Sequence, residues 1–244
     1  MAEFAVEIAG HSFGICSLFE STREYCKRYL TDKKPELQVT VQREDLVFEQ
    51  QMLEKEAVEE GIRIRKFQDP FLERTSIQRA VAEYLFNNNV LMLHGSTVAV
   101  DGRGYLFTAK CGTGKSTHTR LWCQAFGNRA VMVNDDKPFL QVREDGMWVC
   151  GSPWSGKHGL DTNIAVPLAG ICILERGKEN HIVPCSVEKA LPMLLHQGYC
   201  PLDPKKRGAY GSLITRLAER THLWQMQCNK DVEAAFTAYR AMNV

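Results

Sequence analysis

The stretch "FTAKCGTGKSTHTRLW" (107–122) contains residue types that suit the binding of a phosphate group. A phosphate-binding loop usually reads Gly, four residues, then Gly-Lys-Ser or Gly-Lys-Thr. Here Gly114, Lys115 and Ser116 occupy the last three positions, and Ala109 occupies the first. In such a loop the backbone amides converge on a phosphate, and the following helix adds its dipole. The spacing therefore predicts a nucleotide site.

Each position of this loop has a chemical role. Gly112 and Gly114 let the backbone turn tightly, and the methyl group of Ala109 is tolerated if φ is negative there. Lys115 can reach the β- and γ-phosphates, and the Ser116 hydroxyl can join a Mg²⁺ shell. The alternative is a chance Gly-Lys-Ser in an ordinary loop, which the expected strand–loop–helix context disfavours. The residues expected to contact the nucleotide are Lys110, Cys111, Gly112, Thr113, Gly114, Lys115, Ser116 and Thr117.

Two adjacent carboxylates follow the next apolar segment, in "NDD" (134–136). Carboxylates at a strand end can hold Mg²⁺ and orient an attacking hydroxyl. We predict that Asp136 binds the metal together with Ser116, and that Asp135 accepts the hydroxyl proton. Asn-Asp-Asp is also ordinary turn chemistry. The phosphate loop upstream favours the functional interpretation.

Three further polar residues could act on a transferred phosphoryl group. His94 lies in "HGS" before the loop strand, Lys157 lies in the segment 151–163, which is rich in Gly and Ser, and Arg176 ends an apolar segment. A histidine can approach a phosphate or a carboxylate, and loops on a rigid scaffold often carry function. We predict that all three contribute to catalysis. The alternatives are a histidine satisfied inside a sheet and ordinary surface cations.

The elements that must position these residues follow from periodicity and breaker residues. Strands are expected at 2–8, 12–18, 37–41, 90–100, 105–109, 130–136, 164–176 and 222–228, with a hairpin over 138–151. The segment 180–185 is expected to pair with 164–176, which Pro167 should interrupt. Helices are expected at 19–31, 44–60, 71–87, 115–126, 187–197, 206–220 and 230–241.

A short turn, "DGRG" (101–104), joins the strand over 90–100 to the loop strand. Such a turn makes its two strands antiparallel, whereas parallel strands are joined through helices. The sequence therefore predicts an α/β protein with mixed, largely antiparallel sheets around the phosphate loop, and argues against a GTPase-like or adenylate-kinase-like core. We expect an N-terminal α/β lobe over 1–89, packed on a catalytic core over 90–244.

Composition limits the remaining possibilities. The chain has 244 residues, 44% of them hydrophobic and 24% charged, and a formal net charge of +1. This charge gives no reason to expect binding to nucleic acid or an anionic membrane. The longest apolar run, 164–174, is shorter than the roughly 20 residues of a membrane span. The acidic N-terminal segment lacks the order of a signal peptide, and the nine cysteines include no C-x-x-C pair. We therefore expect a cytoplasmic protein with reduced thiols.

The order of these motifs resembles the nucleotide-binding core shared by HPr kinase/phosphorylase and phosphoenolpyruvate carboxykinase. Both families place a histidine-bearing strand before the loop strand and an Asp-Asp pair after the loop helix. The matching positions are His94 and Ser96 for the histidine element, 109–117 for the phosphate loop, and Asp135 and Asp136 for the acidic pair. The resemblance is clearest over 90–176, and the whole chain also resembles a group of bacterial HPr-kinase-like proteins.

The resemblance implies a carboxykinase-like core and a kinase that uses ATP and Mg²⁺. The acceptor would be a hydroxyl, either Ser or Thr of a protein or peptide, or a small molecule. HPr kinases form symmetric oligomers, so an oligomer is compatible with the resemblance. Ala109 stands where both families have glycine. No segment matches the one that HPr kinase uses for its reverse reaction, so the resemblance does not extend to phosphorylase activity or to HPr as substrate.

Two other functions are compatible with the sequence. One is a nucleotide-binding regulatory module without catalysis, which the altered phosphate loop leaves open. The other is a carboxykinase-type lyase, which would need clustered arginines for two carboxylates. The arginines within residues 1–89 are mostly single, so this function is ranked last.

Overall fold

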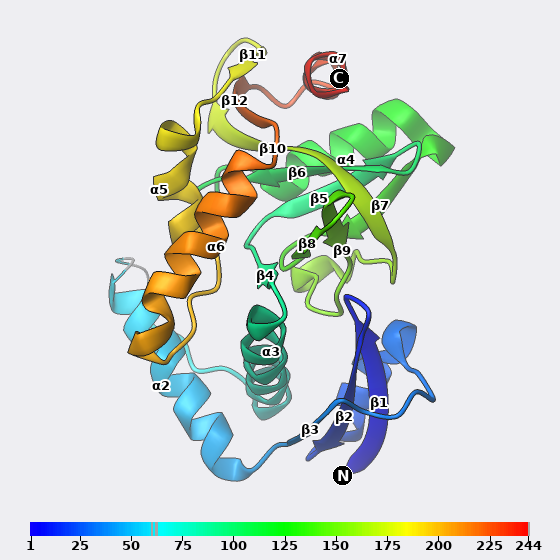
Figure 1. Cartoon of the computed structure of the whole chain (residues 1–244), viewed down its shortest axis with the longest axis vertical. Coiled ribbons are helices and arrows are strands. Elements are labelled where there is room, and N and C mark those ends of the chain that lie inside the picture. The colour runs from blue at the N-terminus through cyan, green and yellow to red at the C-terminus, as the bar shows by residue number, and fades with distance from the viewer. Residues whose placement is uncertain (60, 62, 244) are drawn as a thin grey trace. The chain divides into compact units, whose positions relative to one another are not determined.

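A computed structural model of the chain describes residues 1–59, 61 and 63–243. The chain divides into two compact units, Met1–Leu85 and Phe86–Val244. The first unit has a three-stranded sheet and the second has a nine-stranded sheet (Figure 1). All the residues that the sequence predicts for the nucleotide, the metal and catalysis belong to the second unit.

The first unit combines a small sheet with helices. Strands β1 (Ala2–Ile8) and β2 (His11–Ser17) are antiparallel, and β3 (Leu37–Thr40) runs parallel to β2. The helices are α1 (Glu20–Tyr25), α2 (Arg43–Glu59) and α3 (Asp69–Asn87), which continues into the second unit. The helix expected over 19–31 is shorter than predicted, because α1 is followed by a 3-10 turn, Lys27–Tyr29. Residue 60, at the end of the helix expected over 44–60, lies outside the described residues.

A buried ion pair joins two helices of the first unit. The carboxylate of Glu49 in α2 is 1% exposed and accepts hydrogen bonds from both Nε and Nη2 of Arg79 in α3. A carboxylate that has left water requires such a partner, because an unpaired buried charge is strongly destabilising. The pair therefore fixes α2 against α3.

The second unit contains a curved mixed sheet. Its strands are β4 (Val90–Met92), β5 (Ser96–Val100), β6 (Arg103–Thr108), β7 (Ala130–Asn134), β8 (Phe139–Arg143), β9 (Gly146–Cys150), β10 (Ala165–Arg176), β11 (His181–Pro184) and β12 (Leu223–Cys228). Their order is β4-β8-β9-β10-β6-β5-β7, and β12 pairs with both β10 and β11. Most neighbours are antiparallel, whereas β10 runs parallel to β6 and β12. The predicted fold class, α/β with mixed and largely antiparallel sheets around the loop, is confirmed.

Strand β10 connects the two parts of this sheet. Its first residues, Ala165–Pro167, pair with β9, and the pairing with β6 shifts register between Leu168 and Gly170. The interruption expected at Pro167 is wrong, since the strand continues through this residue. Proline lacks an N–H, and sheets tolerate it beside such irregularities. β10 therefore pairs with one antiparallel neighbour, β9, and with two parallel neighbours, β6 and β12.

Two expectations about pairing are also corrected. Residues 90–100 form two strands, because β4 pairs with β8 whereas β5 pairs with β6 and β7. The segment between them is held by other elements: Leu93 bridges Gly198, and the His94 amide donates to the Gln197 carbonyl at 2.8 Å. Strand β11 pairs with β12 and not with β10.

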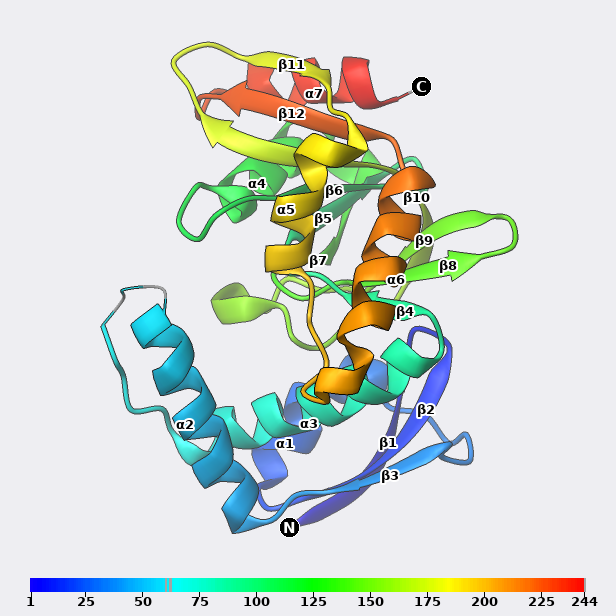
Figure 2. The same ribbon diagram turned by 60° about the vertical axis from the view of Figure 1, so that its left-hand side comes forward.

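Helices cover both faces of the sheet in the second unit. These are α4 (Lys115–Phe126), α5 (Val187–Gln197), α6 (Arg207–Glu219) and α7 (Glu233–Met242). Figure 2 shows α5 and α6 side by side on one face. Alternate residues of β6 serve the two faces, as strand geometry requires. Leu106 packs into the cluster under α5 and α6, whereas Tyr105 and Phe107 pack into the cluster under α4 and α7.

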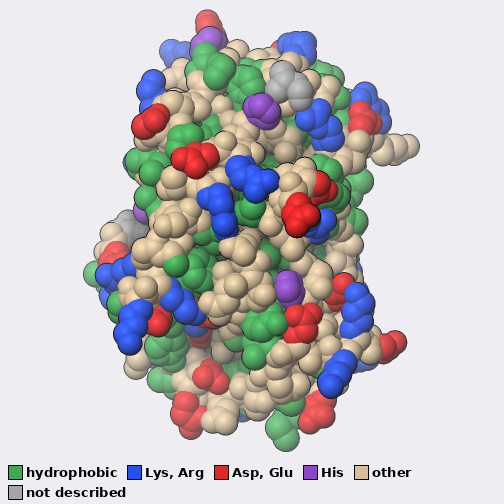
Figure 3. Space-filling model, in the orientation of Figure 1, with side chains coloured by type: hydrophobic (Ala, Val, Ile, Leu, Met, Phe, Trp, Pro, Cys, Tyr) green, Lys and Arg blue, Asp and Glu red, His purple; other side chains and the backbone are tan. Residues whose placement is uncertain are grey.

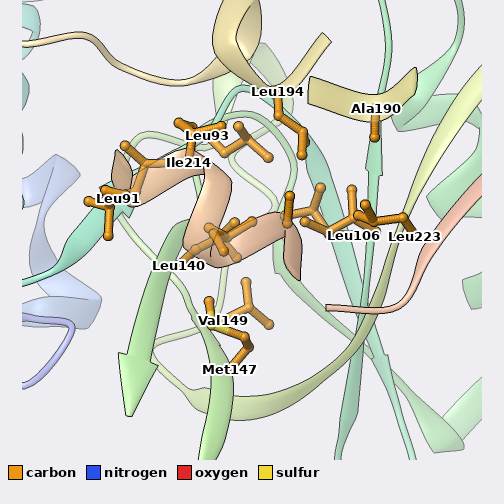
Figure 4. Close-up of a cluster of buried hydrophobic side chains, with 14 of the residues drawn as sticks. Leu91, Leu93, Leu106, Leu140, Met147, Val149, Ala190, Leu194, Ile214 and Leu223 are labelled. Carbon is orange, nitrogen blue, oxygen red and sulfur yellow. The ribbon is translucent and has the colours of Figure 1, made fainter. Parts of the chain in front are cut away.

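The cluster under α5 and α6 is a dense apolar layer, part of which Figure 4 shows. It joins leucines of the segment before β5 to side chains of the hairpin and of both helices. Its members include Leu91, Leu93, Leu106, Leu140, Met147, Val149, Ala190, Leu194, Ile214 and Leu223. This layer fixes one side of the sheet that carries the phosphate loop.

On the face that Figure 3 shows, acidic and basic side chains are interspersed. The thiols of Cys111, Cys123, Cys150 and Cys172 are free. Within the described residues, no helix combines the length and the hydrophobicity that a membrane span requires.

A buried histidine lies in α4, one turn after the phosphate loop. His118 is 2% exposed, and its Nε2 accepts a hydrogen bond from Trp122 Nε1 at 3.1 Å. The neutral ring must then carry its proton on Nδ1, which has no hydrogen-bond partner among the described residues. Burial lowers the pKa of His118 to about 4.

We expect His118 to make the protein less stable in mild acid. Below its usual pKa of about 6.5 the unfolded chain takes up a proton, whereas the folded chain does not until about pH 4. Stability from this residue is therefore complete above pH 6.5 and falls by up to ~1.4 kcal/mol per pH unit below it. The measurement is urea unfolding of the wild type and His118→Gln at pH 7 and pH 5. Gln keeps an acceptor for Trp122 but does not titrate, so equal pH slopes for both proteins would contradict the prediction.

Candidate phosphate-binding and catalytic site

The phosphate loop connects the end of β6 to the start of α4. Gly112 and Gly114 have φ of +74° and +124°, which side chains rarely tolerate, so glycine is required at both positions. Gly114 is also the N-cap of α4 and offers no side chain to its first amides. These amides remain available for an anion at the positive end of the helix dipole. The predicted strand–loop–helix geometry is thus present.

Ala109 is compatible with this geometry. It lies directly after β6, is fully buried and packs in the apolar cluster under α4 and α7. It is not among the non-glycine residues with positive φ. The methyl group therefore occupies core space and strains no turn. Its carbonyl oxygen accepts a hydrogen bond from Lys115 Nζ at 3.1 Å.

Lys115 is a cation that has largely left water, with 8% of the residue exposed. Burial lowers the pKa of its ammonium, whereas the nearby Cys111, Asp136 and Asp135 raise it. The ammonium thus contacts one backbone carbonyl and feels the negative charge of two carboxylates. Such an ammonium can exchange its contact with Ala109 for a phosphate oxygen.

Asp135 is held by hydroxyl groups. Ser96 Oγ donates to Asp135 Oδ1 at 2.7 Å and lies 2.7 Å from Thr119 Oγ1. Ser96 and Thr119 are fully buried, and Asp135 is 7% exposed. Ser96 begins β5 opposite Phe107 of β6, which places it near the end of the loop strand. The β5–β6 hairpin thus brings Ser96 to the acidic pair.

The turn that carries the acidic pair is fixed by Asn134. Its Oδ1 accepts hydrogen bonds from the amides of Asp136, at 2.8 Å, and Lys137, at 2.6 Å. Its Nδ2 donates to the Ser152 carbonyl at 2.8 Å. Asn134 is fully buried, so these bonds replace its contacts with water. This role of Asn134 was not predicted, although asparagine at the start of a turn commonly bonds to the backbone two residues on.

Asp136 faces His94. The distance between His94 Nε2 and Asp136 Oδ1 is 3.3 Å, and the two side chains are 29% and 33% exposed. Burial, aided by the charges of Lys137, Lys115 and His196, lowers the pKa of His94 to about 2. Burial also raises the pKa of Asp136, which Lys137 and Lys115 oppose. His94 is therefore a neutral imidazole at ordinary pH.

Three residues that were not predicted from the sequence also shape this site. Lys137 directly follows the acidic pair, and its charge acts on both Asp136 and His94. His196 and Gln197 reach His94 from the end of α5. Proximity in sequence could have indicated Lys137. Nothing in the sequence connects α5 with His94, because the contact depends on how the chain folds back.

Lys157 belongs to a 3-10 turn, Gly156–His158, beside Asp136. A Cβ atom built on Gly156 would lie 3.3 Å from Asp136 Cβ, so the two backbones are close. Lys157 follows directly and is exposed. The turn brings Lys157 to the vicinity of the acidic pair, with its side chain open to solvent.

Arg176, at the end of β10, contacts the phosphate loop itself. Its Nη2 donates to the Gly112 carbonyl at 2.5 Å and its Nε to the Thr113 carbonyl at 3.4 Å. The parallel pairing of β10 with β6 places these strand ends at the same edge. Arg176 is therefore brought to the predicted nucleotide site, where it contacts the loop backbone.

The predicted Mg²⁺ ligands suit a metal that is shared with a nucleotide. Asp136 and Ser116 both offer oxygen, the atom that Mg²⁺ prefers, and both are partly exposed. Among the described residues, no group of three or more His, Cys, Asp or Glu could hold a metal ion. Mg²⁺ usually binds through one or two carboxylates together with substrate phosphates. The residues present fit that arrangement.

We expect that Ala109→Gly, which restores the usual loop pattern, will destabilise the protein and leave nucleotide binding unchanged. The change removes a buried methyl group and frees the backbone of the unfolded chain, at a cost of about 1–2 kcal/mol. Urea unfolding gives the stability, and calorimetric titration with ATP and Mg²⁺ gives the affinity. A tenfold gain in affinity without loss of stability would show that Ala109 strains the loop.

Comparisons with known proteins add little to this description. No protein-family model matches the chain, and no curated protein matches it. Among solved structures, the chain is similar to the HPr(Ser) kinase/phosphatase from Coxiella burnetii, with 12% identity and a TM-score of 0.30. The alignment covers 51% of this chain and 94% of that one. The function therefore has to be inferred from the residues of the site.

Proposed function

We propose that this protein is a kinase that uses ATP and Mg²⁺ to phosphorylate a hydroxyl group. The observation that carries the proposal is the buried Lys115 at the start of α4, flanked by the charges of Asp135 and Asp136. A cation, a helix N-terminus and two carboxylates are what phosphoryl transfer requires for positioning and charge stabilisation. The order of motifs, which resembles that of HPr kinase and phosphoenolpyruvate carboxykinase, supports phosphoryl transfer.

The roles follow from the chemistry of each group. Lys115 and the amides of the loop, 110–117, hold the phosphates of ATP. The hydroxyl oxygen of the acceptor attacks the γ-phosphorus, and the bond to the bridging oxygen breaks, with its electron pair leaving on ADP. Asp135 accepts the hydroxyl proton. Mg²⁺, held by Asp136 and Ser116 together with the phosphates, would neutralise part of their negative charge.

The remaining polar groups stabilise the transferred phosphoryl. His94 is neutral and can donate a hydrogen bond without adding charge. Lys157 is exposed beside the acidic pair and can move toward an incoming phosphate or acceptor. Arg176 supplies a cation at the loop. The acceptor is a Ser or Thr of a protein or peptide, or a small molecule with a hydroxyl group.

The proposal predicts that ATP binding depends on Lys115 and on Mg²⁺. Calorimetric titration should show saturable binding of ATP to the wild type, strengthened by Mg²⁺. Lys115→Ala should weaken it at least about tenfold, which corresponds to ~1.4 kcal/mol or more of lost binding energy. Lys178→Ala, which changes an exposed lysine in the turn after β10, is the matched control and should bind as the wild type does.

Three other results would change the proposal. No binding of ATP by the wild type would contradict it outright. Tight binding without turnover, unaffected by Asp135→Asn, would favour a regulatory module without catalysis. Conversion of oxaloacetate in the presence of nucleotide would favour a carboxykinase-type lyase.

A further inference from the structure

Ser96 occupies a central position between a catalytic carboxylate and the helix that follows the phosphate loop. Its Oγ lies 2.7 Å from Asp135 Oδ1 and 2.7 Å from Thr119 Oγ1. Both hydroxyl-bearing residues are fully buried, so water does not compete for these bonds. Three residues from β5, α4 and the end of β7 thus form one continuous chain of hydrogen bonds.

The direction of this chain is fixed by the number of protons. An ionised carboxylate can only accept, so Ser96 must donate its single hydroxyl proton to Asp135. Ser96 then has none left for Thr119, so the hydrogen bond between the two hydroxyls forms only with Thr119 as the donor. The carbonyls of Lys115 and Ser116 also lie near Thr119 Oγ1, but at 3.4 and 3.3 Å. The shorter, charge-assisted direction runs from Thr119 through Ser96 to Asp135.

We propose that Ser96 and Thr119 are positioning residues that orient Asp135 for proton acceptance; this inference rests on the proposed kinase function. The bond from Ser96 occupies Oδ1. Among the described residues the Asp135 side chain has no other hydrogen bond, so Oδ2 is left for the acceptor hydroxyl. The proton that the hydroxyl loses goes to Oδ2, while its oxygen bonds to phosphorus and the electron pair of the broken bond leaves on ADP.

The chain also couples the base to the phosphate-binding helix. Thr119 lies one turn after Lys115 and Ser116 on α4. Any shift of α4 therefore moves the hydroxyl that orients Ser96, and Ser96 in turn bonds Asp135. Misplacement of a catalytic group by about 1 Å can lower a rate 100-fold. By fixing the position of Asp135, the two hydroxyls can therefore affect the rate of phosphoryl transfer. A carboxylate held only by solvent would lack this link.

The test uses two substitutions at Thr119 that separate its hydroxyl from its shape. Thr119→Val keeps the branched shape and removes the donor, whereas Thr119→Ser keeps the donor and removes a methyl group. The probe is MgATP with water as the phosphoryl acceptor. We expect kcat to fall at least about tenfold in Thr119→Val with KM unchanged, and to stay within about twofold of the wild type in Thr119→Ser. Equal rates for the two variants would overturn the inference.

A crystal structure of each variant tests the inference without turnover. We expect the Asp135 carboxylate to rotate or become disordered in Thr119→Val and to keep its place in Thr119→Ser. An unchanged Asp135 in Thr119→Val would overturn the positioning role. Calorimetric binding of MgATP to the wild type tests the proposed function separately. Failure of that binding together with a displaced Asp135 would refute the kinase and leave the hydrogen-bond chain standing.

Discussion

The burial of the Lys115 ammonium is the constraint on which the rest of the site depends. A cation that is 8% exposed has lost most of its hydration. Polar and charged groups of the protein therefore have to replace the stabilisation that water would give. Ala109 supplies a carbonyl, and Asp135 and Asp136 supply negative charge. These carboxylates are themselves partly desolvated, so each needs its own donors or neighbours. Ser96 serves Asp135, and the amide network of Asn134 fixes the turn that holds Asp136.

Because each of these groups needs its own partner, the site is built from segments that lie far apart in the chain. The hairpin of β5 and β6 delivers Ser96 to the loop end, and β7 delivers the acidic pair beside it. The segment before β5 leaves the sheet, which turns His94 toward Asp136. Each strand end contributes one or two polar groups, while the apolar layers on both faces hold the strands rigid. A site on rigid elements keeps its geometry when a ligand arrives.

Local signals made the phosphate loop and α4 predictable. Gly112 and Gly114 mark a turn that only glycine adopts easily, and the expected helix over 115–126 matches α4 at both ends. The hairpins and the mixed sheet also followed from short turns. These features depend on neighbours in sequence, so a single sequence contains the information that specifies them.

Features that depend on tertiary contacts were not predictable. Residues 90–100 are mostly apolar, and a single His-Gly-Ser does not by itself show that two strands meet there. The break at Leu93–Gly95 is imposed by β8 and by the end of α5. The pairing of β11 with β12 was missed for the same reason. Ser96 and Thr119 are ordinary small polar residues in sequence. They gain a role only because folding places their hydroxyl groups and the Asp135 carboxylate within hydrogen-bonding distance in the protein interior.

Arg176 has a geometric consequence for the loop. A peptide group is planar and trans, so its C=O and N–H point in opposite directions. Because the guanidinium binds the carbonyl of Thr113, the amide of Gly114 in the same peptide group has to point away from Arg176. The last residue of β10 thereby sets the direction of a backbone donor in a loop more than sixty residues earlier. The pairing of β10 with β6 places Arg176 at the loop, and Arg176 in turn orients the peptide dipole at the start of α4.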